Sequence, residues 1–140
     1  MLYIGHFSFD EIRSDQEIRH GYFTTVVDTD NIERATAEFK ELIYSMKKTH
    51  DTFKRMAAVY LEDIIEFRHI PAKAIVTQIH TAAGEFPETI THSLPGTITP
   101  GIHIYGLDPD VRANENMDSA DEFKISKEFL KFRQGRTGDF

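Results

Sequence analysis

The chain contains no cysteine among its 140 residues. This absence excludes a disulfide framework, a thiolate nucleophile, a zinc site with cysteine ligands and an iron–sulfur cluster. A continuous run of about 18 apolar residues, the length needed to span a membrane as a helix, is also missing. The first residues do not form a basic segment followed by an apolar one, so we expect no secretory signal and a cytoplasmic location.

The sequence also has few of the motifs that accompany common enzyme chemistry. It contains no Walker loop, no glycine-rich dinucleotide turn, no G-x-S-x-G elbow and no H-E-x-x-H pair. We therefore predict no organic cofactor, and a divalent metal is the one cofactor class that the sequence leaves open.

The chain has fewer basic than acidic residues, with 16 Lys and Arg against 23 Asp and Glu, and its formal net charge is -7. Long-range electrostatics then oppose binding to phosphate backbones and anionic membranes. We expect no nucleic-acid partner and no membrane partner.

What the chain does have is enough apolar material for one core. Hydrophobic residues make up 40% of it, with 11 Phe and 5 Tyr, and charged residues make up 28%. Length and composition together predict a single domain over residues 1–133. The polar end, residues 134–140, has the composition of a flexible tail.

A helix is predicted between Asp30 and Lys48. Apolar residues recur there at helical spacing, and charged residues occupy the other positions, including Lys47. Asp30 followed by Glu33 matches a capping box, which places the start of the helix. Residues 2–9 and 20–28 are rich in aromatic and β-branched side chains and are predicted to form two paired strands. The strongly polar residues 10–19 are predicted to join them as a loop or a short helical turn.

Residues 56–67 fit a helical stripe as well as a strand, and we favour the strand because 73–81 after Pro71 is an alternating segment of similar length. The two would form a hairpin. With its turn near Ile70, Tyr60 faces His80 and Glu62 faces Gln78. Strict alternation would then place Asp63 on the opposite face from Glu62 and Glu66.

Shorter elements are predicted after this point. Thr89–Leu94 and Ile102–Leu107 are each expected to form a strand, and Ser119 is expected to cap a C-terminal helix that carries Phe123, Phe129, Leu130 and Phe132. The fold class is α+β: an antiparallel or mixed sheet with one long amphipathic helix on one face, ferredoxin-like or related, plus the C-terminal helix.

Histidine residues on the predicted strands are the main candidates for chemistry. His80 and His103 could meet as metal ligands from neighbouring strands, and His80 with Tyr60 and Glu62 has the residue types of an acid–base catalyst. Tyr105 shares a side of its strand with His103, and Gly106 beside them indicates a bulge or a close backbone approach. Each of these residues also fits an ordinary solvated strand.

Two functions follow from these patterns. The first is a small interaction or ligand-binding module that self-associates, or binds a protein partner, through a sheet face carrying Tyr60, Ile64, Val76 and His80, because exposed apolar groups favour association. The alternative is a small metal-assisted hydrolase or acid–base enzyme that uses the strand-borne histidines.

Overall fold

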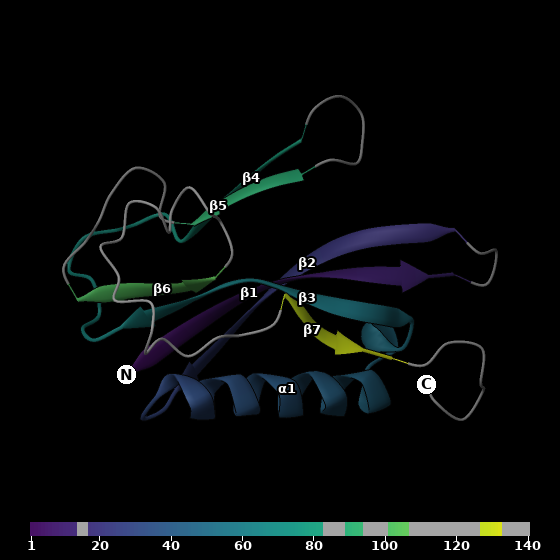
Figure 1. Ribbon diagram of the computed structural model, residues 1–140, viewed down its shortest axis with the longest axis horizontal. Helices are drawn as coiled ribbons and strands as arrows, with labels where there is room; N and C mark the ends of the chain where they lie inside the picture. The colour runs from purple at the N-terminus through teal and green to yellow at the C-terminus, as the bar shows by residue number, and fades with distance from the viewer. Residues whose placement is uncertain (14–16, 83–88, 94–100, 107–126, 133–140) are drawn as a thin grey trace.

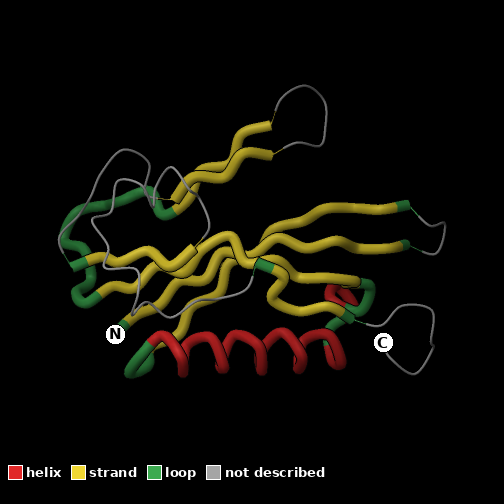
Figure 2. The backbone as a smooth tube through the Cα atoms, viewed as in Figure 1, coloured by secondary structure: helices red, strands yellow, loops and turns green. Residues whose placement is uncertain are grey.

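The computed structural model describes residues 1–13, 17–82, 89–93, 101–106 and 127–132. Within these ranges the fold is α+β, with one helix packed on an antiparallel sheet (Figures 1 and 2). The strands are β1 (Leu2–Ile12), β2 (Ile18–Asp28), β3 (Met56–Phe67), β4 (Gln78–Ala82), β5 (Thr89–Ser93), β6 (Ile102–Gly106) and β7 (Glu128–Lys131). The helix α1 spans Ile32–Thr49, and a short 3-10 turn, η1, spans Asp51–Phe53.

The main sheet has the order β2-β1-β3-β6, and β7 also pairs with β3. The two short strands share one edge of β3, with β6 beside residues 63–67 and β7 beside residues 58–60. β4 and β5 form a separate two-stranded hairpin. No second helix occurs among the described elements and two strands precede α1, so the ferredoxin-like assignment is not confirmed.

The paired strands at the start of the chain are confirmed and are longer than predicted. β1 and β2 match residue for residue from Leu2 with Asp28 to Ile12 with Ile18, without a register shift. The loop predicted over residues 10–19 is therefore wrong at both ends, because its polar side chains continue one face of the hairpin. High polarity alone does not distinguish a loop from the solvent-exposed end of a hairpin.

The predicted amphipathic helix is confirmed, with one correction at its start. Asn31 is the N-cap, since its side-chain oxygen accepts a hydrogen bond of 2.8 Å from the backbone N–H of Arg34. Asp30, predicted as the cap, instead forms an ion pair of 3.0 Å with the Arg34 guanidinium.

Lys47, predicted on the polar side of the helix, is buried. Its Nζ donates to the carbonyl oxygens of Lys54 at 2.9 Å and Met56 at 2.8 Å, and it lies 4.4 Å from the centre of the Phe132 ring. Burial lowers the pKa of Lys47 to about 8. The ammonium thus ties the end of α1 to the start of β3 and the end of β7.

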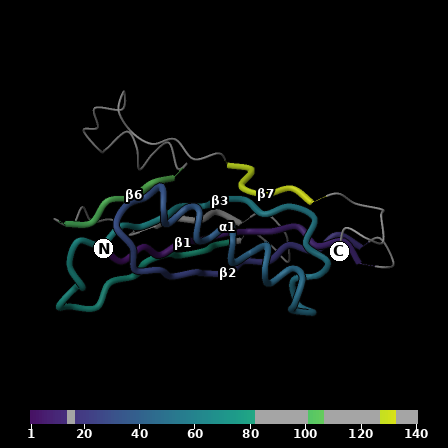
Figure 3. Tube along the Cα trace, turned by 90° about the horizontal axis from the view of Figure 1, so that it is seen from below, coloured from purple at the N-terminus to yellow at the C-terminus, as the bar shows by residue number. Residues whose placement is uncertain are grey.

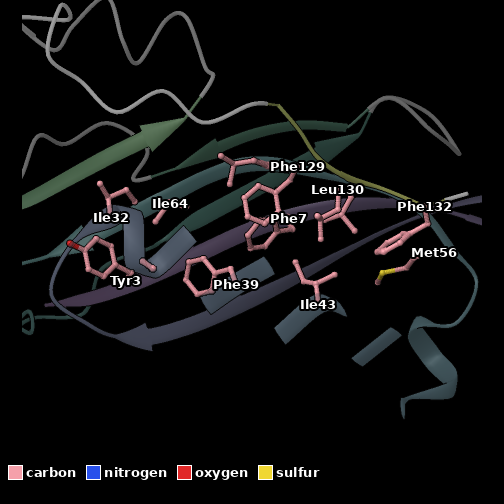
Figure 4. Close-up of a cluster of buried hydrophobic side chains, with 13 residues drawn as sticks. Tyr3, Phe7, Ile32, Phe39, Ile43, Met56, Ile64, Phe129, Leu130 and Phe132 are labelled. Carbon is pink, nitrogen blue, oxygen red and sulfur yellow. The ribbon is translucent and has the colours of Figure 1, made fainter. Parts of the chain in front are cut away.

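The core lies between α1 and one face of the sheet, which we call the helix face (Figure 4). Phe7 of β1, Phe39 of α1 and Phe129 of β7 meet there, with ring centres 5.8 and 5.0 Å from that of Phe7. The C-terminal helix is therefore wrong for Phe129 and Leu130, which lie in β7 and complete the core from the edge of β3. The start of that helix and the tail 134–140 lie outside the described residues.

The strand predicted over residues 56–67 is confirmed as β3, but its predicted partner is wrong. β3 pairs with β1 along one edge and with β6 and β7 along the other. The strand in the 73–81 region is limited to β4, and β4 pairs with β5. The short strands predicted after residue 88 are confirmed as β5 and β6.

Candidate functional site

Polar side chains gather on the side of the sheet away from α1, which we call the far face. Alternation along β1 sends Tyr3, Phe7 and Phe9 to the helix face, where they join the core. The intervening residues His6, Ser8 and Asp10 therefore project from the far face. Cross-strand pairing places Thr24, Tyr22 and His20 of β2 beside them on the same face.

A β-bulge in β3 brings two neighbouring carboxylates to this face. The β1–β3 register shifts between His6 and Phe7, so that Asp63 is opposite His6, Leu61 is opposite Phe7 and Glu62 is the extra residue. The Asp63 carboxylate bonds to His6, and the Glu62 carboxylate accepts from Ser8. The prediction that alternation separates Asp63 from Glu62 is wrong, because a bulge interrupts the two-residue period.

Gly106 permits this bulge to sit inside the sheet. It is opposite Asp63 in β6, and a Cβ atom added to it would lie 2.8 Å from the Asp63 Cβ and 2.9 Å from the Glu62 carbonyl oxygen. Only a residue without a side chain fits such a separation. The close backbone approach indicated by this glycine is thus confirmed.

His6 and Asp63 form the most buried polar pair of the far face. The His6 Nδ1 lies 2.6 Å from an Asp63 carboxylate oxygen, and the two residues are 1% and 5% exposed. Burial raises the pKa of Asp63, while the hydrogen bond and the charge of His6 act in the opposite direction. Burial therefore disfavours the negative charge of the Asp63 carboxylate, and the His6 imidazole stabilises it.

Three further hydrogen bonds continue from this pair toward the end of β1. The Ser8 hydroxyl donates to Glu62 at 2.6 Å, the Tyr60 hydroxyl donates to Asp10 at 2.9 Å, and the His20 Nδ1 lies 2.7 Å from the other Asp10 oxygen. We call His6, Ser8, Asp10, His20, Tyr60, Glu62 and Asp63 the polar row. The hydrogen bond to Asp10, together with burial, raises the pKa of Tyr60.

The predicted site residues are distributed over both faces of the sheet. Tyr60 and Glu62 belong to the polar row, but neither faces its predicted partner on β4. His80 of β4 lies against Tyr22, with ring centres 4.4 Å apart, and so approaches the far face from the separate hairpin. The Gln78 side chain, predicted opposite Glu62, instead lies 2.8 Å from the His80 Nε2.

His103 and Tyr105 lie on the same side of β6, as predicted from their spacing, and that side is the helix face. Their ring centres are 4.3 Å apart, and Tyr105 packs against the core. The Glu66 carboxylate there accepts from the Tyr3 hydroxyl at 2.8 Å and from the Tyr105 hydroxyl at 3.4 Å. His80 and His103 are therefore on opposite faces, and the structure does not bring them together as ligands.

Metal ligation has no other support in the described residues. No group of three or more His, Asp or Glu side chains within them is arranged to hold a metal ion. No helix within them is long and apolar enough to cross a membrane.

Sequence reasoning missed His6, Ser8, Asp10, His20 and Asp63 as members of one site. A signal for the first three was present, because they alternate with aromatic residues along β1. Asp63 had no such signal, since its position depends on the bulge. No protein-family model matches this chain, and neither a curated protein nor a solved structure is significantly similar to it.

Proposed function

We propose that this protein is an interaction module that self-associates through the outer edge of β2. One observation carries the proposal: β2 is a long terminal strand of the main sheet, and no other described strand pairs with its outer edge (Figure 3). A free strand edge presents unpaired backbone N–H and C=O groups, which another strand satisfies by pairing.

The central part of β2 lacks the features that normally protect an edge. Its central residues, 21–27, contain no charged side chain and no proline, and its pairing with β1 has no bulge. Natural proteins use charges, prolines, bulges or short strands to prevent edge pairing. The opposite edge has such protection, because β6 and β7 contain only 5 and 4 residues.

Exposed apolar side chains accompany this edge. Ile18, Tyr22 and Val26 are 63%, 41% and 62% exposed, and alternation places all three on the far face. The surface first predicted for association needs correction, because Ile64 is fully buried in the core and Tyr60 is bonded to Asp10. Self-association thus remains the proposal, with β2 in place of those residues.

Mass measured by light scattering over a wide concentration range tests the proposal. We expect the wild type to form dimers and Val26→Lys to be monomeric, because a lysine at this edge would place a charge against the apolar side chains of the paired strand. Val76→Lys is the matched control, since Val76 is 57% exposed and lies outside β2. A wild type that is monomeric throughout, or equal effects of the two lysines, would contradict the proposal.

A second function, acid–base catalysis, is supported by the two histidine–aspartate pairs of the polar row. In each pair the carboxylate orients an imidazole, which is the arrangement of a general base. We propose His20 as the base for such chemistry, because its side chain is 46% exposed while that of His6 is 2% exposed.

Acylation by diethyl pyrocarbonate tests this assignment, since the reagent modifies accessible imidazole nitrogens. Peptide mass spectrometry is expected to show rapid modification of His20 and slow modification of His6. Equal rates at the two positions would contradict the assignment.

A further inference from the structure

The side chains along the edge of β2 are arranged so that two copies of this strand can pair with each other. We propose, resting on the function proposed above, that two copies pair β2 with β2 in antiparallel orientation, about a two-fold axis that passes beside Tyr22. Tyr22 then faces Tyr22 of the second copy, and Ile18 faces Val26 of the second copy. The two main sheets join into one continuous sheet.

A second copy fits this edge because a two-fold axis pairs identical strands in antiparallel orientation. Directly opposite residues lie on the same face of a sheet, so the axis has to pass beside a single residue position. The central part of β2 carries no charge, and its self-pairing therefore brings no like charges together. The axis can pass beside one of three positions near the middle of the strand, which are Tyr22, Phe23 and Thr24.

The axis at Tyr22 is favoured by the side chains of the far face. It places Ile18, Tyr22 and Val26, the three exposed apolar residues of β2, against one another across the interface. Aromatic and β-branched cross-strand pairs stabilise antiparallel sheets. The intervening His20 then faces Thr24 of the second copy, which is a polar pair.

The other two axes match these side chains less well. An axis at Phe23 places Ile18 opposite Asp28, so that an apolar group would desolvate a carboxylate. An axis at Thr24 places Ile18 opposite position 30, beyond the end of β2, and leaves it exposed. It would also pair His20 with Asp28, although His20 is bonded to Asp10 and Asp28 to the amino group of Met1.

The absence of cysteine makes disulfide trapping a direct test, since a single introduced thiol can link only to its copy. Directly opposite Cα atoms in an antiparallel pair are about 4.5–5.5 Å apart, within the range that a disulfide bridges. With the axis at Tyr22, the two copies of Thr24 are about 14 Å apart along the strands, from a rise of about 3.4 Å per residue. Tyr22→Cys is therefore the trapping variant and Thr24→Cys its matched control.

We expect mild oxidation to convert Tyr22→Cys into a covalent dimer at least roughly tenfold more completely than Thr24→Cys, because only the first pair meets the geometry of a disulfide. The double variant Ile18→Cys with Val26→Cys keeps Tyr22 and is expected to form the same covalent dimer. Its two thiols lie about 27 Å apart within one chain, so they do not link internally.

The outcomes separate this inference from the function on which it rests. Stronger linkage of Thr24→Cys than of Tyr22→Cys would overturn the register while leaving association through β2 intact. A dimer of the wild type that is lost with Val26→Lys but is linked at none of these positions would overturn pairing with a second β2. A monomeric wild type would overturn the proposed function itself.

Discussion

Replacement of Phe7 by alanine is expected to lower the free energy of unfolding by about 3–5 kcal/mol, the usual cost of removing a buried aromatic ring. Phe7 is 1% exposed, and its ring contacts Phe23, Phe39 and Phe129 from three different elements. Removal of the ring leaves a cavity between α1, β2 and β7 that the surrounding backbone fills only in part. The midpoint of thermal unfolding is expected to fall by roughly 10–15 °C.

Two comparisons make this expectation specific. Phe7→Leu keeps most of the apolar volume and is expected to lose much less stability. Leu42→Ala removes a large apolar side chain that is 41% exposed on α1, and its effect is expected to stay below about 1 kcal/mol. Chemical denaturation of the three variants measures these differences, and a Phe7→Ala loss no greater than that of Leu42→Ala would contradict the described core.

Replacement of Asp63 by alanine is also expected to lower the free energy of unfolding. The change leaves the His6 imidazole buried without the carboxylate that lies 2.6 Å from it. Leaving a buried polar group without its hydrogen-bond partner costs about 1–3 kcal/mol, because that group stays desolvated and unpaired. Asp63→Asn is the matched control, since the amide oxygen still accepts a hydrogen bond from His6.

Chemical denaturation near neutral pH is the measurement for this pair. We expect the wild type and Asp63→Asn to have the higher free energies of unfolding, and Asp63→Ala to have a clearly lower one. Equal stability of the asparagine and alanine variants would show that the hydrogen bond to His6 contributes little.

The raised pKa of Asp63 adds a dependence on pH to the same comparison. The folded state binds a proton at this carboxyl more readily than the unfolded state does, because the site is buried. Its stabilising contribution is therefore complete below the unfolded pKa and is lost as the pH rises through the folded pKa. The free energy of unfolding of the wild type, relative to Asp63→Asn, is expected to decrease from about pH 3 to pH 7.

The elements that were predicted from the sequence are those whose pattern lies within one segment. α1 has apolar residues at helical spacing over its whole length, and β2 is dense in aromatic and β-branched residues. Such patterns specify which side of an element is buried, and they do so before its neighbours are known. The strand at residues 56–67 was identified for the same reason, although its partner was not.

Several of the predictions that were wrong concern contacts between distant segments. β3 was paired with the segment that follows it, whereas its actual neighbours are β1, β6 and β7. Phe129 and Leu130 were placed in a helix, because a short apolar pair with charged neighbours fits either structure. The free edge of β3 beside residues 58–60 decides in favour of the strand, since pairing there satisfies backbone hydrogen bonds.

Within the candidate site, some residues were identified from the sequence and others were not. Tyr60 and Glu62 were selected by residue type and do belong to the polar row. His6 and Asp63 were not selected, because their pairing depends on the bulge at Glu62, and the bulge depends on β1, β3 and Gly106 lying side by side. Alternation by itself predicts the wrong face for Asp63.

The amino-acid sequence by itself therefore determined the fold class, the amphipathic helix, most of the strand segments and the acidic charge of this protein. Each of these depends on the composition or on a period of two or 3.6 residues within one segment. Only the tertiary structure decided the order of the strands, the face on which each carboxylate lies and the exposure of the β2 edge. These features arise from pairing between segments far apart in the chain, where several registers satisfy the same local pattern and the packing of the complete core selects one of them.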